Sequence, residues 1–125
     1  MQALLLWSAS VSAAVTWYVH TFIGGVHVAR PLLANTSLPK ASKWLAYYCW
    51  HLATLMLAAI SVLFGASALG YFGTALVASL SMFCFSCSAL SIGVAVKGQI
   101  APWRFPSTSL FALTGVFGLA AAAAA

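Results

Sequence analysis

The chain has 125 residues, of which 64% are hydrophobic and only 4% are charged. Soluble domains carry about 25% charged residues, so this composition argues against a water-soluble domain and predicts a membrane protein. The formal net charge is +5, but the five basic residues are scattered over two short segments and form no stripe, which argues against a nucleic-acid partner.

The first predicted membrane span covers residues 3–23, because an apolar stretch of about 20 residues crosses the hydrocarbon core. We expect this span to end at the Gly-Gly pair at 24–25. The mixed segment 26–43 contains two prolines, which argue against one continuous helix. Its scattered leucines and valines predict that it lies along the membrane surface.

Three further spans follow in chain order, at residues 44–65, 74–96 and 107–125. A tight turn at 70–73 joins the second span to the third, and a polar loop at 97–106 joins the third to the fourth. The sequence therefore predicts an all-α membrane protein, a four-transmembrane-helix bundle in which residues 1–125 form one transmembrane domain.

The basic residues predict the orientation of the bundle. All five lie in two segments, residues 26–43 and 97–106. Two membrane crossings separate these segments, so both lie on the same side of the membrane. The positive-inside rule places that side in the cytoplasm and both termini on the non-cytoplasmic side of a bacterial inner membrane, cytoplasmic or intracytoplasmic. The residues expected at the membrane interface, with anionic lipids as partners, are Arg30, Lys40, Lys43, Trp44, Lys97, Trp103 and Arg104.

Small and hydroxyl-bearing residues recur every three or four positions in each span. Helices in lipid pack through such residues, so we predict that these stripes form the contacts between helices. The predicted stripes are Ser8, Ser12, Thr16 and His20; Tyr47, His51, Thr54, Ala58, Ser61 and Gly65; Ala75, Ser79, Met82, Ser86, Ala89 and Gly93; and Thr108, Phe111, Gly115, Gly118 and Ala122.

His20 and His51 are the candidate cofactor-binding residues. They lie roughly 6 Å and 10 Å inside the basic ends of their spans, and an ionisable residue at such depth suggests a function. One hypothesis is axial ligation of haem or of a chlorophyll or bacteriochlorophyll magnesium. The alternative is a neutral imidazole that donates to a neighbouring carbonyl or hydroxyl, such as that of Thr16 or Thr54, with no cofactor bound.

The cysteines and the third histidine give no indication of catalysis or of a metal site. Cys84 and Cys87 form a C-x-x-C pair in the middle of a lipid-buried span, where free cysteines act as small hydrophobic residues. His27 is expected to be a solvated histidine at the interface. No nucleophile has an accompanying base and no glycine loop could hold a phosphate, so we predict that the chain is not an enzyme.

Asp and Glu are absent, although about six or more would be expected even if the apolar spans halved their usual share. One hypothesis is that acidic residues occupy some positions given as Ala, Ser or His. Peptide mass spectrometry of the native protein tests this hypothesis, and a gene without acidic codons would contradict it.

Two stretches resemble a group of small uncharacterised bacterial four-helix inner-membrane proteins. The resemblance covers about half of the chain. The first stretch has the Gly-Gly pair at 24–25, Ala-Arg-Pro-Leu-Leu at 29–33 and Tyr-Tyr-Cys-Trp-His-Leu-Ala-Thr at 47–54, and the second has Phe-Pro-Ser at 105–107, Leu-Phe at 110–111 and Gly-Val-Phe-Gly-Leu at 115–119. The group tends to have His-Pro-Gln where this chain has Phe-Pro-Ser at 105–107, a departure that weakens the match. The resemblance implies a four-helix inner-membrane fold and supplies no activity.

Four apolar helices with little mass outside the membrane offer mainly lateral surface for packing. We therefore predict a non-enzymatic accessory subunit of a larger bacterial membrane complex, either photosynthetic (reaction centre and light-harvesting) or respiratory, with other transmembrane subunits as partners. The first alternative is a haem- or chlorophyll-binding subunit that uses His20 or His51. The second is a small multidrug-type transporter, whose family depends on a membrane-embedded glutamate that this sequence lacks.

Overall fold

The computed structural model describes all residues from 1 to 125 and contains helices but no strands. Four helices are long and apolar enough to cross a membrane, which indicates an integral membrane protein. The elements are α1 (Gln2–Tyr18), η1 (Val19–Ala29), α2 (Arg30–Ala34), α3 (Lys40–Ala68), α4 (Thr74–Lys97), η2 (Pro102–Arg104) and α5 (Pro106–Ala123).

The first helix is longer than predicted, because α1, η1 and α2 form one continuous helix from Gln2 to Ala34. The expected end at the Gly-Gly pair is therefore wrong, and residues 26–34 continue the first span instead of forming a separate surface segment. The prediction that 26–43 is not one continuous helix is confirmed, because the first helix ends at Ala34 and the next begins at Lys40. Physically, η1 is a π-helix, in which the N–H of Arg30 bonds to the carbonyl of Gly25, five residues back. Pro31 follows directly and has no N–H to place, so the change in hydrogen-bond register lets the helix pass the proline.

The first helix ends in a tight turn. Asn35 Oδ1 accepts hydrogen bonds from the backbone N–H groups of Ser37 and Leu38, at 2.8 and 3.2 Å. Lys43 Nζ donates to the carbonyls of Leu33 and Asn35, at 3.2 and 2.9 Å, and so places a positive charge at the helix C-terminus. The second span consequently begins at Lys40, four residues before its predicted start at 44.

The predicted turn at 70–73 is confirmed, and its geometry explains the glycine. Gly70 has φ +86°, and the N–H of Tyr71 bonds to the carbonyl of Ala66 at 3.1 Å while that of Gly70 bonds to Ser67 at 3.0 Å. This pattern is the Schellman motif, which needs a left-handed residue after the helix end. The third and fourth spans match their predicted ranges to within two residues.

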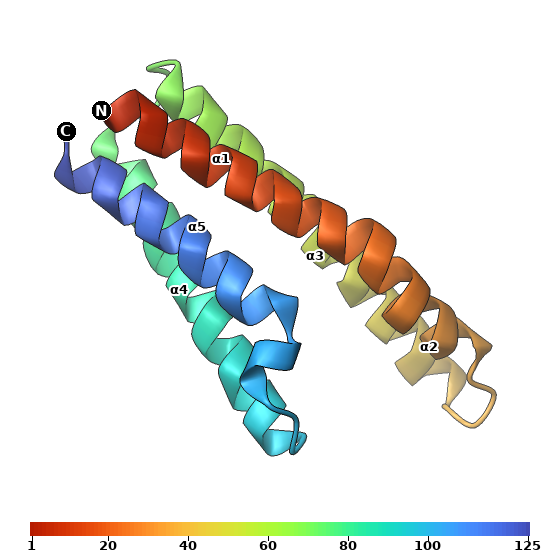
Figure 1. Cartoon of the computed structure of the whole chain (residues 1–125). Coiled ribbons are helices and arrows are strands. Elements are labelled where there is room, and N and C mark those ends of the chain that lie inside the picture. Colours follow the sequence, from red (N-terminus) through yellow and green to blue (C-terminus); the bar gives the residue numbers. More distant parts are fainter.

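The helices form two hairpins that diverge like the arms of a V (Figure 1). One hairpin contains α1 and α3, the other contains α4 and α5, and α1 packs against α5 to join them. Both termini and the turn between α3 and α4 lie at the closed end. The two basic loops form the separate hairpin tips at the other end, which is the arrangement expected of four crossings.

The core lies toward the closed end of the V. Its buried residues are Leu6, Ala9, Ala13, Ile60, Phe64, Val77, Cys84 and Ala121. Cys84 is free and fully buried in this cluster, whereas Cys87 is half-buried outside it. Polar contacts join the same helices: Ser10 Oγ donates to the carbonyl of Ser61 at 2.8 Å, and Thr114 Oγ1 donates to Ser12 Oγ at 2.9 Å.

The four predicted contact stripes have different outcomes. In the first, second and fourth spans the stripe residues are buried or half-buried, with the exception of His51, which is exposed. The stripe predicted for the third span is wrong, because all six of its residues are exposed. The buried face of α4 is instead formed by Val77, Ser81, Cys84, Ser88 and Ala95.

Candidate functional site

A cavity of about 580 Å³ lies between the two hairpins and is named here the inter-hairpin cavity. Small-molecule sites have volumes of about 300–1,000 Å³, so its size suits a ligand. Most of its wall is apolar, and the side chains with polar or charged groups are Thr16, His20, His27, Trp50, Arg104 and Ser107. Residues from η1, α3, η2 and the start of α5 all line it, so it exists only because the hairpins diverge.

His20 is held firmly at the wall of this cavity. Its Nε2 lies 3.1 Å from the carbonyl oxygen of Trp50, and its ring stacks on the Trp50 indole with centroids 4.0 Å apart. This is the contact with a neighbouring carbonyl that a neutral imidazole makes, although the partner is Trp50 and not the predicted Thr16 or Thr54. In the tautomer in which Nε2 donates, Nδ1 keeps a lone pair that can bind a metal.

His51 lines a different cavity, of about 350 Å³, between η1 and α3, named here the η1–α3 cavity. Its ring meets the Tyr47 ring edge to face, with centroids 4.5 Å apart. Trp50 lines both cavities and lies between them. His20 and His51 therefore do not face one shared site, and no group of three His, Cys, Asp or Glu residues could hold a metal ion.

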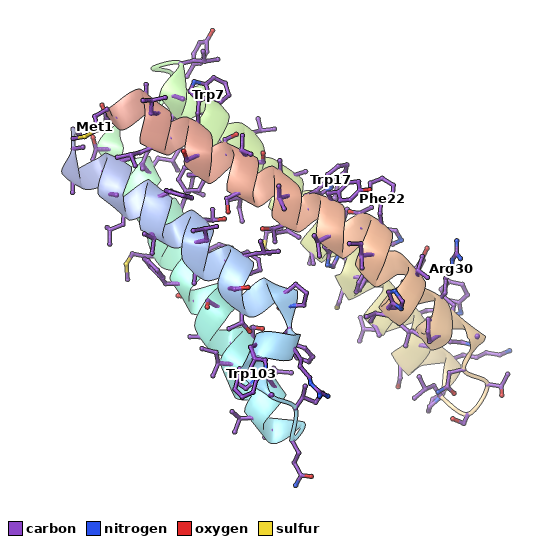
Figure 2. The ribbon with its side chains drawn as sticks, in the orientation of Figure 1. Met1, Trp7, Trp17, Phe22, Arg30 and Trp103 are labelled. Carbon is purple, nitrogen blue, oxygen red and sulfur yellow. The ribbon has the colours of Figure 1, made fainter.

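The residues predicted at the membrane interface lie together at the diverging end. Figure 2 shows Arg30 and Trp103 at the tips of different hairpins, both far from Met1. Trp44 and Trp103 are exposed, with 58% and 83% of their surface accessible, as side chains at a lipid headgroup layer would be. The other predicted members also lie at the hairpin tips: Lys40, Lys43, Lys97 and Arg104.

Sequence reasoning missed Thr21, which lines the η1–α3 cavity. Its Oγ1 is buried and has no hydrogen-bond partner. It is the only buried side-chain nitrogen or oxygen in the chain that lacks one. Unpaired buried polar groups are rare and require an explanation. The only signal in the sequence is Pro31, whose effect on the helix register ten residues earlier could not be read from the pattern of residues.

Comparison of the chain with protein-family models, with curated proteins and with solved structures finds no match to any of them. The resemblance to small bacterial four-helix inner-membrane proteins therefore stays a prediction. The two cavities and the exposed helix faces are the features on which a function can be based.

Proposed function

We propose that the chain is a non-enzymatic accessory subunit that packs against other transmembrane subunits of a larger complex in a bacterial inner membrane, cytoplasmic or intracytoplasmic. The host complex is photosynthetic (reaction centre and light-harvesting) or respiratory. The observation that supports this proposal is an exposed face of α4 on which five of six residues are small. It is named here the α4 outer face: Ala75, Ser79, Met82, Ser86, Ala89 and Gly93.

Small residues on an exposed helix face have a physical use in lipid. Apolar side chains gain nothing by leaving lipid for another helix, so helices associate where small side chains let the backbones approach closely. The α4 helix already uses its opposite face to pack on α5. Ser79 and Ser86 donate to the carbonyls of Ala75 and Met82 within α4, at 2.9 and 3.0 Å, so the α4 outer face is stable in lipid before a partner binds.

In this proposal both basic hairpin tips face the cytoplasm, and both termini face the other side. The five basic residues lie at the tips, and none lies at the end that carries the termini. A bilayer with an anionic cytoplasmic surface attracts that end, which supports the orientation.

Crosslinking from the α4 outer face tests the proposal. A photoreactive amino acid at position 86 should crosslink to another membrane subunit in native membranes, and Ala89→Leu should abolish the crosslink by holding the helices apart. A photoreactive amino acid at position 59 and the variant Ala59→Leu are matched controls, because Ala59 is a small exposed residue of α3 outside the face. Equal crosslinking from positions 86 and 59, or none from either, would contradict the proposal.

The second candidate function is a haem- or chlorophyll-carrying subunit. The position of His20 at the wall of a cavity of about 580 Å³, with its ring fixed by Trp50, favours this candidate. If it is correct, the purified chain absorbs visible light and His20→Leu removes the absorbance. His51→Leu leaves the absorbance intact, because His51 lines the other cavity. A colourless chain would contradict this candidate and leave the first one standing.

A further inference from the structure

The buried Thr21 hydroxyl lies in the π-helix and has no hydrogen-bond partner. Serine and threonine hydroxyls in the other helices commonly donate to the carbonyl four residues back, as Thr16 does to Ser12 at 2.8 Å and Thr54 does to Trp50 at 3.1 Å. Thr21 lies near the start of η1, and its hydroxyl makes no such bond to the carbonyl of Trp17, four residues back. The hydroxyl is therefore left for a partner from outside the helix.

Other donors line the same cavity. Arg30, Tyr47 and His51 are lining residues of the η1–α3 cavity, and they come from both of its walls. Arg30 has no acidic partner, because the chain contains no Asp or Glu. A guanidinium binds phosphate through two parallel hydrogen bonds, and the tyrosine and histidine rings can add donors. The cavity is thus suited to an anionic group with several acceptor oxygens.

An apolar surface of aromatic side chains runs from the cavity along the first helix toward the closed end. Phe22 lines the cavity and contacts Tyr18 and Trp17, with ring centroids 5.0 and 6.0 Å apart. Figure 2 shows Arg30, Phe22 and Trp17 in this order from the hairpin tip toward the closed end. Arg30 and Trp17 lie roughly 20 Å apart along the helix, a distance comparable to one leaflet of the bilayer with its headgroups.

We propose that the η1–α3 cavity binds an anionic phospholipid, with its phosphate beside Arg30, Tyr47 and His51, an ester carbonyl deeper in the cavity beside Thr21, and an acyl chain along Phe22 toward Trp17. Basic pockets between transmembrane helices near the cytoplasmic surface bind the headgroups of such lipids. The proposal depends on the membrane insertion and orientation given above, but it does not depend on a protein partner. The proposal gives Thr21 and Arg30 a role in lipid binding, in addition to any role in helix packing.

Lipid retention by the whole chain tests this site. The protein is placed in vesicles of equal parts phosphatidylcholine and phosphatidylglycerol with identical acyl chains, extracted in mild detergent, and examined by native mass spectrometry. We expect one retained phosphatidylglycerol. Arg30→Gln should lower its retention about tenfold and Thr21→Val about threefold, as loss of a charged and of a neutral hydrogen bond would. Arg104→Gln is the matched control, since Arg104 does not line this cavity.

Several results would overturn the lipid site. These are equal retention of the two lipids, an equal loss of phosphatidylglycerol with Arg104→Gln and Arg30→Gln, and displacement of the lipid by inorganic phosphate, which would identify a free-phosphate site. An acidic residue found in the cavity by peptide mass spectrometry would also overturn it, because Arg30 would then have an internal partner. Carbonate extraction of the vesicles measures insertion separately, so a chain that inserts without retaining lipid contradicts only this inference.

Discussion

Gly118 shows how a single residue sets the distance between helices. It lies on α5, where a Cβ would overlap Ser81 Oγ of α4 and would lie 2.8 Å from the ring of Phe64 of α3. Ser81 and Phe64 are both fully buried, so neither can move aside into empty space. The absence of a side chain at this position is therefore what lets three helices meet at the closed end of the V.

We predict that Gly118→Ala lowers the free energy of unfolding by about 1–3 kcal/mol, because the added methyl overpacks the core. Gly93→Ala is the control, since a Cβ at Gly93 meets no atom within 4 Å. That variant should be unchanged or up to about 1 kcal/mol more stable, owing to the helix propensity of alanine. Unfolding in mixed detergent followed by circular dichroism gives both values. Equal effects of the two substitutions would show that the close approach is not stabilising.

Two serines join α1 to α3 by a reciprocal pair of hydrogen bonds. Ser10 Oγ donates to the carbonyl of Ser61 at 2.8 Å, and Ser61 Oγ donates to the carbonyl of Ser10 at 2.9 Å. We predict that Ser10→Ala and Ser61→Ala each cost about 0.6 kcal/mol, the average for such bonds between membrane helices. Ser79→Ala, on the α4 outer face, should cost close to nothing. The same unfolding assay measures all three variants. A larger loss of unfolding free energy for Ser79→Ala than for Ser10→Ala or Ser61→Ala would contradict a stabilising role of the serine pair.

At the scale of elements, the sequence predicted which segments are helical better than it predicted their ends and faces. Hydropathy reveals an apolar stretch, so all four long helices were predictable. Continuation of the first helix through Gly24, Gly25 and Pro31 was not predictable, because it depends on a π-helical hydrogen-bond register that no residue pattern indicates. The face of α4 was also unpredictable, since small residues occur on both of its sides and only the packing with α5 decides which one is buried.

The close contact between η1 and α3 gives a prediction at this scale. A Cβ at Gly24 would lie 2.7 Å from Cη2 of Trp50, whereas a Cβ at Gly25 meets no atom within 4 Å. The Trp50 ring is also stacked on His20, so it cannot yield without losing that contact. We predict that Gly24→Ala destabilises the protein by about 1 kcal/mol and shifts the His20 ring resonances in NMR spectra, while Gly25→Ala does neither. Identical spectra for both variants would contradict this packing.

At the scale of the whole molecule, the V explains why the candidate sites lie where they do. The hairpins share a core at the end that carries the termini, and they separate toward the basic tips (Figure 1). The inter-hairpin cavity lies where the hairpins separate, and the η1–α3 cavity lies beside the π-helix inside one hairpin. The candidate residues His20 and His51 were predictable as intramembrane histidines. Their division between two cavities was not, because it depends on the position of Trp50.

In the proposed topology, four helices cross the membrane and both hairpin tips lie in the cytoplasm. Single cysteines at Lys40, Gln99 and Tyr71, in a chain whose Cys49, Cys84 and Cys87 are replaced by alanine, can be labelled in intact cells with a reagent that does not cross the inner membrane. We expect labelling of Tyr71→Cys alone, with Lys40→Cys and Gln99→Cys labelled only after the membrane is opened. Labelling of Lys40→Cys or Gln99→Cys in intact cells would contradict it.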